Sequence, residues 1–246
     1  MKRLVDLYSG YAVNALSYAT VRDYCDSADN IASLAALSGD LKDVQRPWVV
    51  KAVVGNVARG ARLLEIGAGQ PFVADLLTQL GYQVTVVDPY DGSGNGPREY
   101  AHFVNSFPQI RFVRDQFSDE VRNLTPASFD CIYSISVLEH VPIPEIPRVC
   151  AGIKKFVVPR NGKTVHAIDH VLKGAGDSHH LERLFVLADG LGFEKSALVS
   201  LFGRLEEDVE AYFLSAEGHN RWRGAVKYDE FPMRRVVSLQ LALNVP

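Results

Sequence analysis

The chain has 246 residues, of which 47% are apolar and 22% charged, and its formal net charge is −3. This length and apolar content suffice for one large domain with a full core, and the small net charge without a basic run disfavours nucleic acid as a partner. No stretch approaches a membrane span and no secretory segment follows the N-terminus, so we expect no membrane contact and a cytoplasmic location.

Three cysteines, Cys25, Cys131 and Cys150, are too few and too widely spaced for a disulfide framework or a cysteine-based zinc site. We predict that all three are reduced and buried.

The N-terminal part predicts a helical extension. Apolar residues recur at helical spacing over residues 11–38, and a second helix is expected after Pro47, which suits a first helical turn. Within one domain we expect three parts, namely a helical extension over 1–47, a cofactor-binding core over 48–200, and a C-terminal cap with the last strand over 201–246.

From residue 61 onward, short apolar strands alternate with helices. Strands are expected at 61–67, 82–88, 110–115, 129–135, 163–171, 197–203 and 234–243, and helices at 71–81, 97–107, 117–123, 146–157 and 177–193. This order predicts an α/β fold with a doubly wound, Rossmann-like sheet that is covered on both faces. We expect the sheet to be mostly parallel with an antiparallel C-terminal strand.

The stretch LLEIGAGQPF, residues 63–72, places a glycine turn directly after a strand. Gly67 and Gly69 allow the backbone to turn sharply and to approach a ligand closely. Glu65 precedes the turn, and Asp88 ends the next strand, where a carboxylate can accept both hydrogens of a ribose diol. The alternative is an ordinary tight turn between strand and helix.

The residues after the glycines distinguish two cofactors. A dinucleotide-binding loop would reach a third glycine and present free amides to a pyrophosphate, whereas this loop has Phe72 at that place and Pro71, which lacks an N–H group. S-adenosylmethionine has no phosphate and carries a positively charged sulfur. An acidic loop with few free amides therefore favours S-adenosylmethionine.

Four segments occur in a characteristic order over roughly residues 48–200, namely LLEIGAGQP, VTVVDPY, FVRDQF and FDCIYSISVLEHVP. With them the chain resembles the class I S-adenosylmethionine-dependent methyltransferases that act on small molecules. The resemblance implies that Asp88 holds the ribose and that Pro89 and Tyr90 flank the adenine. It also implies that the amino-acid end of the cofactor faces Glu65, Gly67, Ala68 and Gly69.

The same resemblance extends to the next two strands. It implies contacts to the adenine edge from Asp115, followed by Gln116 and Phe117, and it places Ser134 and Ser136 along the cofactor cleft. The alternative for Asp115 is a solvated acid that caps a helix starting near residue 118. The chain departs from the family at positions 70 and 71, where many relatives have a small or hydroxyl residue and then glycine.

Methyl transfer from a sulfonium depends mainly on positioning, and a base tuned near neutral pH adds rate. In the strand over 163–171, the two-residue period places His166 and His170 on one face and Asp169 on the other. His170 and Asp169 lie near the strand's C-terminal end, where ligands bind in open parallel sheets. We predict His170 as the base with Asp169 beside the site, and the alternative is a satisfied structural histidine.

His140 follows the fourth core strand, and the resemblance places it beside the cleft, either in catalysis or in fixing the loop. A metal site can be drawn from the acids and histidines over 166–180, but their spacing does not support one, and we expect no metal. The aromatic and basic segment over 210–235 suits an acceptor pocket, core packing or an oligomer interface, which is compatible with a homodimer.

These patterns together predict an S-adenosylmethionine-dependent methyltransferase that moves a methyl group to an oxygen or nitrogen of a small-molecule acceptor, such as a secondary metabolite or a sugar. One alternative is a nicotinamide-dependent oxidoreductase on a similar sheet. Another is a catalytically silent module that binds the cofactor without turnover.

Overall fold

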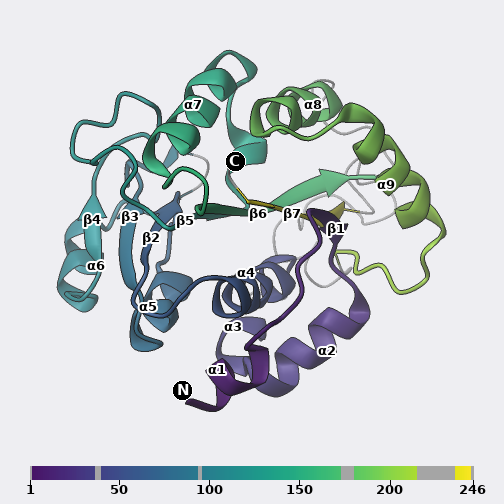
Figure 1. The fold of residues 1–246 in the computed structure, drawn as a ribbon, viewed down its shortest axis with the longest axis horizontal. Coiled ribbons are helices and arrows are strands. Elements are labelled where there is room, and N and C mark those ends of the chain that lie inside the picture. Colours follow the sequence, from purple (N-terminus) through teal and green to yellow (C-terminus); the bar gives the residue numbers. More distant parts are fainter. Residues whose placement is uncertain (1, 37–39, 94–95, 173–179, 215–235, 245–246) are drawn as a thin grey trace.

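The computed structural model describes residues 2–36, 40–93, 96–172, 180–214 and 236–244 (Figure 1). Its centre is a seven-stranded sheet with the order β1-β7-β6-β5-β2-β3-β4. The strands are β1 (Leu16–Tyr18), β2 (Arg62–Ile66), β3 (Gln83–Val87), β4 (Arg111–Val113), β5 (Cys131–Ile135), β6 (Lys163–Val171) and β7 (Val236–Asn244).

The middle of the sheet is parallel and one side is antiparallel. Strands β2 to β6 pair in parallel, whereas β7 runs antiparallel to both β6 and β1. The predicted α/β fold class, with a mostly parallel sheet and an antiparallel C-terminal strand, is therefore confirmed. The chain builds outward from β2 to β4 and then continues from β5 in the opposite direction, so a topological switch point lies between β2 and β5.

Helices cover both faces of the sheet (Figure 1). One face carries α1 (Lys2–Tyr8), α2 (Val21–Asn30), α3 (Ala32–Ala35), α4 (Lys42–Asn56), α5 (Phe72–Gln79) and α6 (Tyr100–Ser106). The other face carries α7 (Ile146–Phe156), α8 (His180–Leu191) and α9 (Lys195–Glu207). Each face has its own hydrophobic core against the sheet. No described helix has both the length and the apolar content required to span a bilayer.

Helix α7 shows why these segments fold as they do. Its buried side chains, Ile146, Val149, Ile153 and Phe156, recur at three- or four-residue intervals and form one apolar stripe. By contrast, α4 is buried along almost its whole length, because α1, α2 and α3 cover the side that does not face the sheet. From this position α4 places Gln45 and Arg46 beside residues at the ends of β6 and β2.

Several predicted elements are wrong. Residues 117–123 form turns rather than a helix, and their apolar side chains at 117 and 121 anchor the segment in the core. The expected strand over 197–203 lies inside α9, where Leu198, Leu201 and Leu205 are buried with helical spacing. Residues 16–18, expected in a helix, form strand β1 instead.

Two smaller predictions also need correction. Pro47 lies inside α4, which begins at Lys42, so it does not open the helix. Cys25 is exposed, whereas Cys131 and Cys150 are buried as predicted, and all three are free thiols.

Candidate cofactor and acceptor site

The predicted site residues gather at one edge of the sheet. Because β2, β3, β4, β5 and β6 are parallel, the loops that follow them leave from the same edge, and the switch point is where open sheets bind ligands. This edge carries Glu65, Gly67, Ala68, Gly69, Asp88, Pro89, Asp115, Gln116, Ser136 and Asp169.

The glycine loop requires glycine at two positions. Gly67 and Gly69 have φ angles of 65° and 54°, in the left-handed region that side chains disfavour. A Cβ atom at Gly67 would also lie 2.8 Å from the side chain of Val137, which belongs to the loop after β5. The sharp turn predicted from the sequence is therefore present, and it packs closely against the next loop along the edge.

Asp88 fastens this loop in addition to its predicted binding role. Its Oδ2 accepts a hydrogen bond from the Gly69 N–H at 2.9 Å, and its Oδ1 accepts one from the Tyr90 N–H at 2.8 Å. Burial raises the pKa of Asp88, and the two amide hydrogen bonds oppose this effect. Each carboxylate oxygen keeps a second lone pair, so Asp88 can also accept hydrogen bonds from a ribose.

Glu65 is buried beneath the loop, and its side chain points toward the α4 face. The Tyr133 hydroxyl donates to Glu65 Oε2 at 3.0 Å. Burial raises the pKa of Glu65 to about 8, although the Tyr133 hydrogen bond and the charge of Arg46 act in the opposite direction. The Arg46 guanidinium lies 5.6 Å from the centre of the Phe72 ring, next to the start of α5.

Sequence reasoning missed Arg46 and Tyr133. The available signal for Arg46 was a cation next to the apolar run that starts at Pro47, and the signal for Tyr133 was a hydroxyl-bearing side chain in a short apolar strand. Neither signal shows that the two side chains approach Glu65, because their meeting depends on how α4 packs over the sheet.

The predicted adenine side is built from aromatic residues. Tyr90 is 1% exposed and has a φ of 48°, which is uncommon for a bulky residue. Its ring centre lies 5.4 Å from that of Phe103 and 5.7 Å from that of Tyr100. Pro89 before it is partly buried. Aromatic side chains thus pack in the core next to Asp88, and the adenine-flanking role of Pro89 and Tyr90 stays a prediction.

The segment after β4 divides into two parts. Asp115 and Gln116 are exposed, and the Gln116 N–H donates to Asp115 Oδ1 at 2.8 Å. Phe117 instead lies in the core with its ring 6.1 Å from that of Phe156. The Phe117 side chain therefore points away from the edge, and only its backbone remains near the predicted adenine contact.

A hydrogen-bonded cluster connects β5, β6 and α4, and we call it the Gln45–Ser136–Asp169 cluster. Gln45 Nε2 donates to Asp169 Oδ1 at 2.7 Å. The Ser136 hydroxyl lies 2.8 Å from Gln45 Oε1 and 3.1 Å from Asp169 Oδ1. Ser136 has a φ of 51°, so the backbone turns sharply where β5 ends. Sequence reasoning found Ser136 and Asp169 but missed Gln45, which comes from α4.

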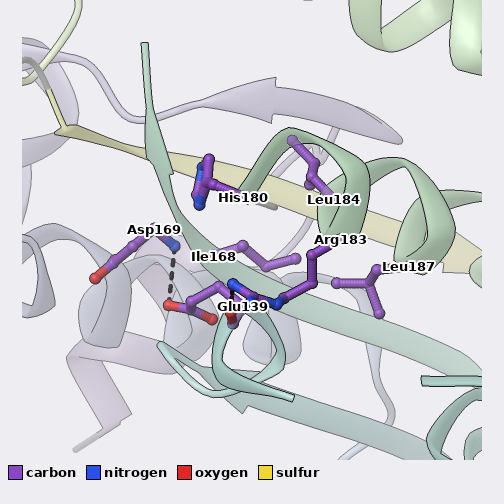
Figure 2. A pocket seen from close by; sticks show the side chains of 7 residues that line it. All are labelled: Glu139, Ile168, Asp169, His180, Arg183, Leu184 and Leu187. Atoms are coloured by element: carbon purple, nitrogen blue, oxygen red, sulfur yellow. Dashed lines mark hydrogen bonds between the residues drawn. The ribbon is translucent and has the colours of Figure 1, made fainter. Parts of the chain in front are cut away.

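Glu139 supports the cluster from behind. It lies in the short 3-10 helix η2 (Leu138–His140), and its Oε1 accepts a hydrogen bond from the Asp169 N–H at 3.0 Å. Burial and the nearby Asp169 carboxylate raise the pKa of Glu139 well above its usual range. Figure 2 shows that Glu139, His180 and Arg183 border a cavity of about 10 Å³, whereas the Asp169 carboxyl group points to the other side of the strand.

The histidines of β6 face the opposite side of the sheet from the Asp169 carboxyl group. The His170 ring stacks on Phe202 with centres 4.6 Å apart, and its Nδ1 lies 3.0 Å from His180 Nε2. Because His180 Nε2 also accepts the Val171 N–H at 3.0 Å, His170 Nδ1 is the donor. Burial, together with His180, lowers the pKa of His170 to about 3. This geometry supports the structural alternative for His170 over the predicted base.

Ser134 and His166 form a second buried pair on that same face. The Ser134 hydroxyl lies 2.9 Å from His166 Nδ1, and burial lowers the pKa of His166 to about 3. The Ser134 hydroxyl points into the face of the sheet that α7, α8 and α9 cover, and not toward the edge where the cofactor cleft is predicted. His140 lies exposed at the end of η2.

The structure describes only part of the other predictions. In the described ranges no group of three or more His, Cys, Asp or Glu residues is arranged to hold a metal ion. His179, which belonged to the metal alternative, lies outside the described residues. Most of the aromatic and basic segment, residues 215–235, also lies outside them.

The comparison with protein families agrees with this geometry. A family model described as "Methyltransferase domain" matches residues 27–225, most of the chain. The chain belongs to this methyltransferase family. The resemblance to class I S-adenosylmethionine-dependent methyltransferases that the sequence motifs indicated is thereby confirmed.

Among curated proteins, this methyltransferase-family chain is similar to enzymes named ubiquinone biosynthesis O-methyltransferase. The protein from Xanthomonas campestris pv. campestris (strain B100) is 34% identical over 97 residues, which cover 39% of each chain. The protein from Idiomarina loihiensis is 28% identical over 183 residues, covering 64% of this chain and 74% of the relative. The chain thus spans about two fifths of the first of these relatives.

Solved structures share the fold at low identity. Phosphoethanolamine N-methyltransferase 2 of Haemonchus contortus, in complex with S-adenosyl-L-methionine, matches with a TM-score of 0.54 and 19% identity, over 91% of this chain and 60% of that one. The 1,6-didemethyltoxoflavin-N1-methyltransferase of Burkholderia thailandensis matches with a TM-score of 0.50 and 16% identity, over 92% of this chain and 86% of that one.

Proposed function

We propose that this chain is an S-adenosylmethionine-dependent methyltransferase that methylates an oxygen atom of a small molecule. The observation that carries the proposal is the buried Asp88 carboxylate at the switch point, bonded to the glycine loop through the Gly69 N–H. An acid at this place can accept hydrogen bonds from a ribose. The family match and the methyltransferase names of several relatives support the same cofactor.

The charges around the loop fit a cofactor that has a sulfonium and an amino-acid end. Glu65 and Asp88 supply acidic groups, and Arg46 places a cation near Glu65. The loop offers few free amides for a pyrophosphate, because Pro71 has no N–H group and the Gly69 N–H already bonds to Asp88. These features favour S-adenosylmethionine over a nicotinamide dinucleotide.

Asp169 is the base that we propose. Its Oδ1 accepts from Gln45 and Ser136, and no described residue donates to its Oδ2. The side chain is only partly buried, so Oδ2 can accept the proton of an acceptor hydroxyl. A carboxylate that is held in place by two neighbours keeps its free oxygen in a fixed direction, which suits a reaction that depends on orientation.

When bound, S-adenosylmethionine would supply the methyl group to the acceptor oxygen and would leave as S-adenosylhomocysteine, a neutral thioether. Asp169 takes up the proton that this oxygen loses, while Gln45 and Ser136 hold the carboxylate. An acceptor hydroxyl must lose a proton to give a neutral ether, and the Asp169 carboxylate is placed at this edge to accept it. The curated relatives named O-methyltransferases support an oxygen acceptor.

The test begins with calorimetry of the pure, folded protein. S-adenosylmethionine should bind and NADH should not, and the reverse result would support the oxidoreductase alternative. Turnover is then measured with a library of phenols and other small hydroxyl compounds.

For the base, Asp169→Asn should lower kcat by roughly 10²- to 10⁴-fold and leave the Kd for S-adenosylmethionine within about twofold, because the residue lies away from the glycine loop. Asp189→Asn, at an exposed position of α8, is the control and should behave as wild type. Unchanged turnover in Asp169→Asn would show that Asp169 is not the base.

A further inference from the structure

Glu139 is an acid for which the proposed reaction has so far no use. Its side chain is 7% exposed, and it lies directly behind the strand that carries Asp169 (Figure 2). One carboxyl oxygen, Oε1, accepts the Asp169 N–H at 3.0 Å. The other, Oε2, is buried and has no hydrogen-bond partner among the described residues. A buried carboxyl oxygen without a partner costs free energy, so its presence here needs an explanation.

The surroundings hold Glu139 in position from both sides. Arg183 Nη1 of α8 donates to the backbone oxygen of Glu139 at 3.2 Å, so η2 is connected to α8. The side chain of Glu139 then connects η2 to the backbone of β6. The neighbouring cavity of about 10 Å³ is also lined by Ile168, Leu184 and Leu187. Glu139 is thus a polar link between α8 and the end of β6, in addition to the contacts of His180 with His170 and Val171.

We propose that Glu139 is a positioning residue, which fixes the backbone of Asp169 so that the Asp169 carboxylate points from the opposite strand face toward the acceptor. This inference rests on the proposed function, because it assigns Glu139 a task only if Asp169 acts on an acceptor. The Asp169 amide and the Asp169 carboxyl group belong to the same residue. A shift of the backbone at the amide therefore also moves the carboxylate. A misplacement of about 1 Å can cost on the order of 10²-fold in rate.

The protonation of Glu139 makes the inference testable. A buried carboxyl group beside a second carboxylate favours its neutral form. Because Oε1 accepts the amide N–H, the task requires an acceptor oxygen and no charge. A glutamine at this position keeps the acceptor, whereas a methionine has similar length and volume but no comparable acceptor. The pair Glu139→Gln and Glu139→Met therefore separates the hydrogen bond from the filling of space.

The experiment measures kcat, the KM for S-adenosylmethionine and amide hydrogen exchange in the intact chain. Glu139→Gln should keep at least half of the wild-type kcat, and Glu139→Met should lose tenfold or more with the cofactor KM within about twofold. The Asp169 amide, observed by NMR, should exchange at least tenfold faster in Glu139→Met than in wild type or Glu139→Gln. Glu206→Met, at an exposed site of α9, is the control for a methionine substitution.

Two results would overturn the inference. If Glu139→Gln loses as much activity as Glu139→Met while its Asp169 amide stays protected, the ionised carboxyl group takes part in the chemistry. If Glu139→Met matches wild type in both kcat and exchange, Glu139 does not position Asp169. Should wild type bind cofactor but methylate no acceptor, the proposed function fails, whereas the exchange data still decide whether Glu139 fixes the Asp169 backbone.

Discussion

At the cofactor edge, Asp88 combines a structural contact with a predicted binding role. Its two oxygens accept hydrogen bonds from the N–H groups of Gly69 and Tyr90, so the carboxylate that is predicted to bind the ribose also shapes the loop. The sequence was sufficient to predict that Asp88 lies at the end of a strand and that Gly67 lies in a sharp turn, because an acid at a strand end and glycines in a turn leave local signals. Gln45 left none, since its contact with Asp169 joins residues 124 positions apart.

Replacement of Asp88 should weaken the binding of S-adenosylmethionine, because the carboxylate is predicted to bind the ribose in addition to holding the loop. Asp88→Asn retains one oxygen but loses the charge and one acceptor, and charge-assisted hydrogen bonds contribute about 1.5–3 kcal/mol each. We expect the Kd for S-adenosylmethionine, measured by calorimetry, to rise about tenfold or more. Asp91→Asn, at an exposed site nearby, should leave it unchanged. Equal Kd values for the two variants would contradict the ribose role.

Gly67 offers a test of the loop geometry itself. Gly67→Ala places an alanine at a strained positive φ and brings its Cβ to 2.8 Å from the Val137 side chain. Gly60→Ala also places an alanine at a positive φ, but no atom lies within 4 Å of its Cβ. Overpacking costs about 1–3 kcal/mol beyond the backbone effect. Urea denaturation should therefore show a larger loss of unfolding free energy for Gly67→Ala, and a loss no greater than that of Gly60→Ala would contradict the close packing of the two loops.

At the scale of elements, α4 organises one half of the molecule. It supplies Gln45 and Arg46 to the site at its first turns, and further along Lys51 contacts α2. Sequence periodicity identified most helices and strands of the core. It failed over 197–203, where a short apolar run fits both a strand and a helix, and over 16–18, where three residues carry too little pattern to reveal a strand.

Lys51 is a buried cation that connects α4 to α2. Its Nζ lies 2.5 Å from Asp26 Oδ2 and 2.9 Å from Ser27 Oγ, and its own side chain is 2% exposed. Lys51→Met removes these contacts and leaves Asp26 Oδ2 with the Tyr8 hydroxyl as its remaining donor, so unfolding free energy should fall by about 2 kcal/mol. Lys154→Met, on the exposed face of α7, is the matched control. An equal thermal midpoint for both variants would contradict this role.

At the scale of the whole molecule, buried titratable groups link stability to pH. His166 and His170 have pKa values of about 3 in the folded protein, below the usual value of 6.5. The unfolded chain therefore takes up protons first, and stability from each histidine is present above pH 6.5 and declines as the pH falls toward 3, by about 1.4 kcal/mol per pH unit. Glu65 acts in the opposite direction, because its raised pKa retains a proton in the folded state.

The difference between variants isolates one histidine from these opposing effects. His170→Gln keeps a donor toward His180 but cannot take up a proton in either state. Urea denaturation at pH 7, 6 and 5 should show that the stability of wild type declines with acid more than that of His170→Gln, by about 0.7 kcal/mol between pH 7 and 6 and about 1.2 kcal/mol between pH 6 and 5. Parallel pH curves for the two proteins would show that His170 is not held neutral.

The position of β7 has a consequence for how the molecule is made. This strand lies between β1 and β6, although β1 is near the start of the chain and β7 follows every other described strand. During synthesis both neighbours must therefore wait with open backbone edges until residues 236–244 leave the ribosome. Open edges are templates for pairing with other chains, so the nascent polypeptide is most vulnerable to aggregation in the interval before β7 emerges and pairs.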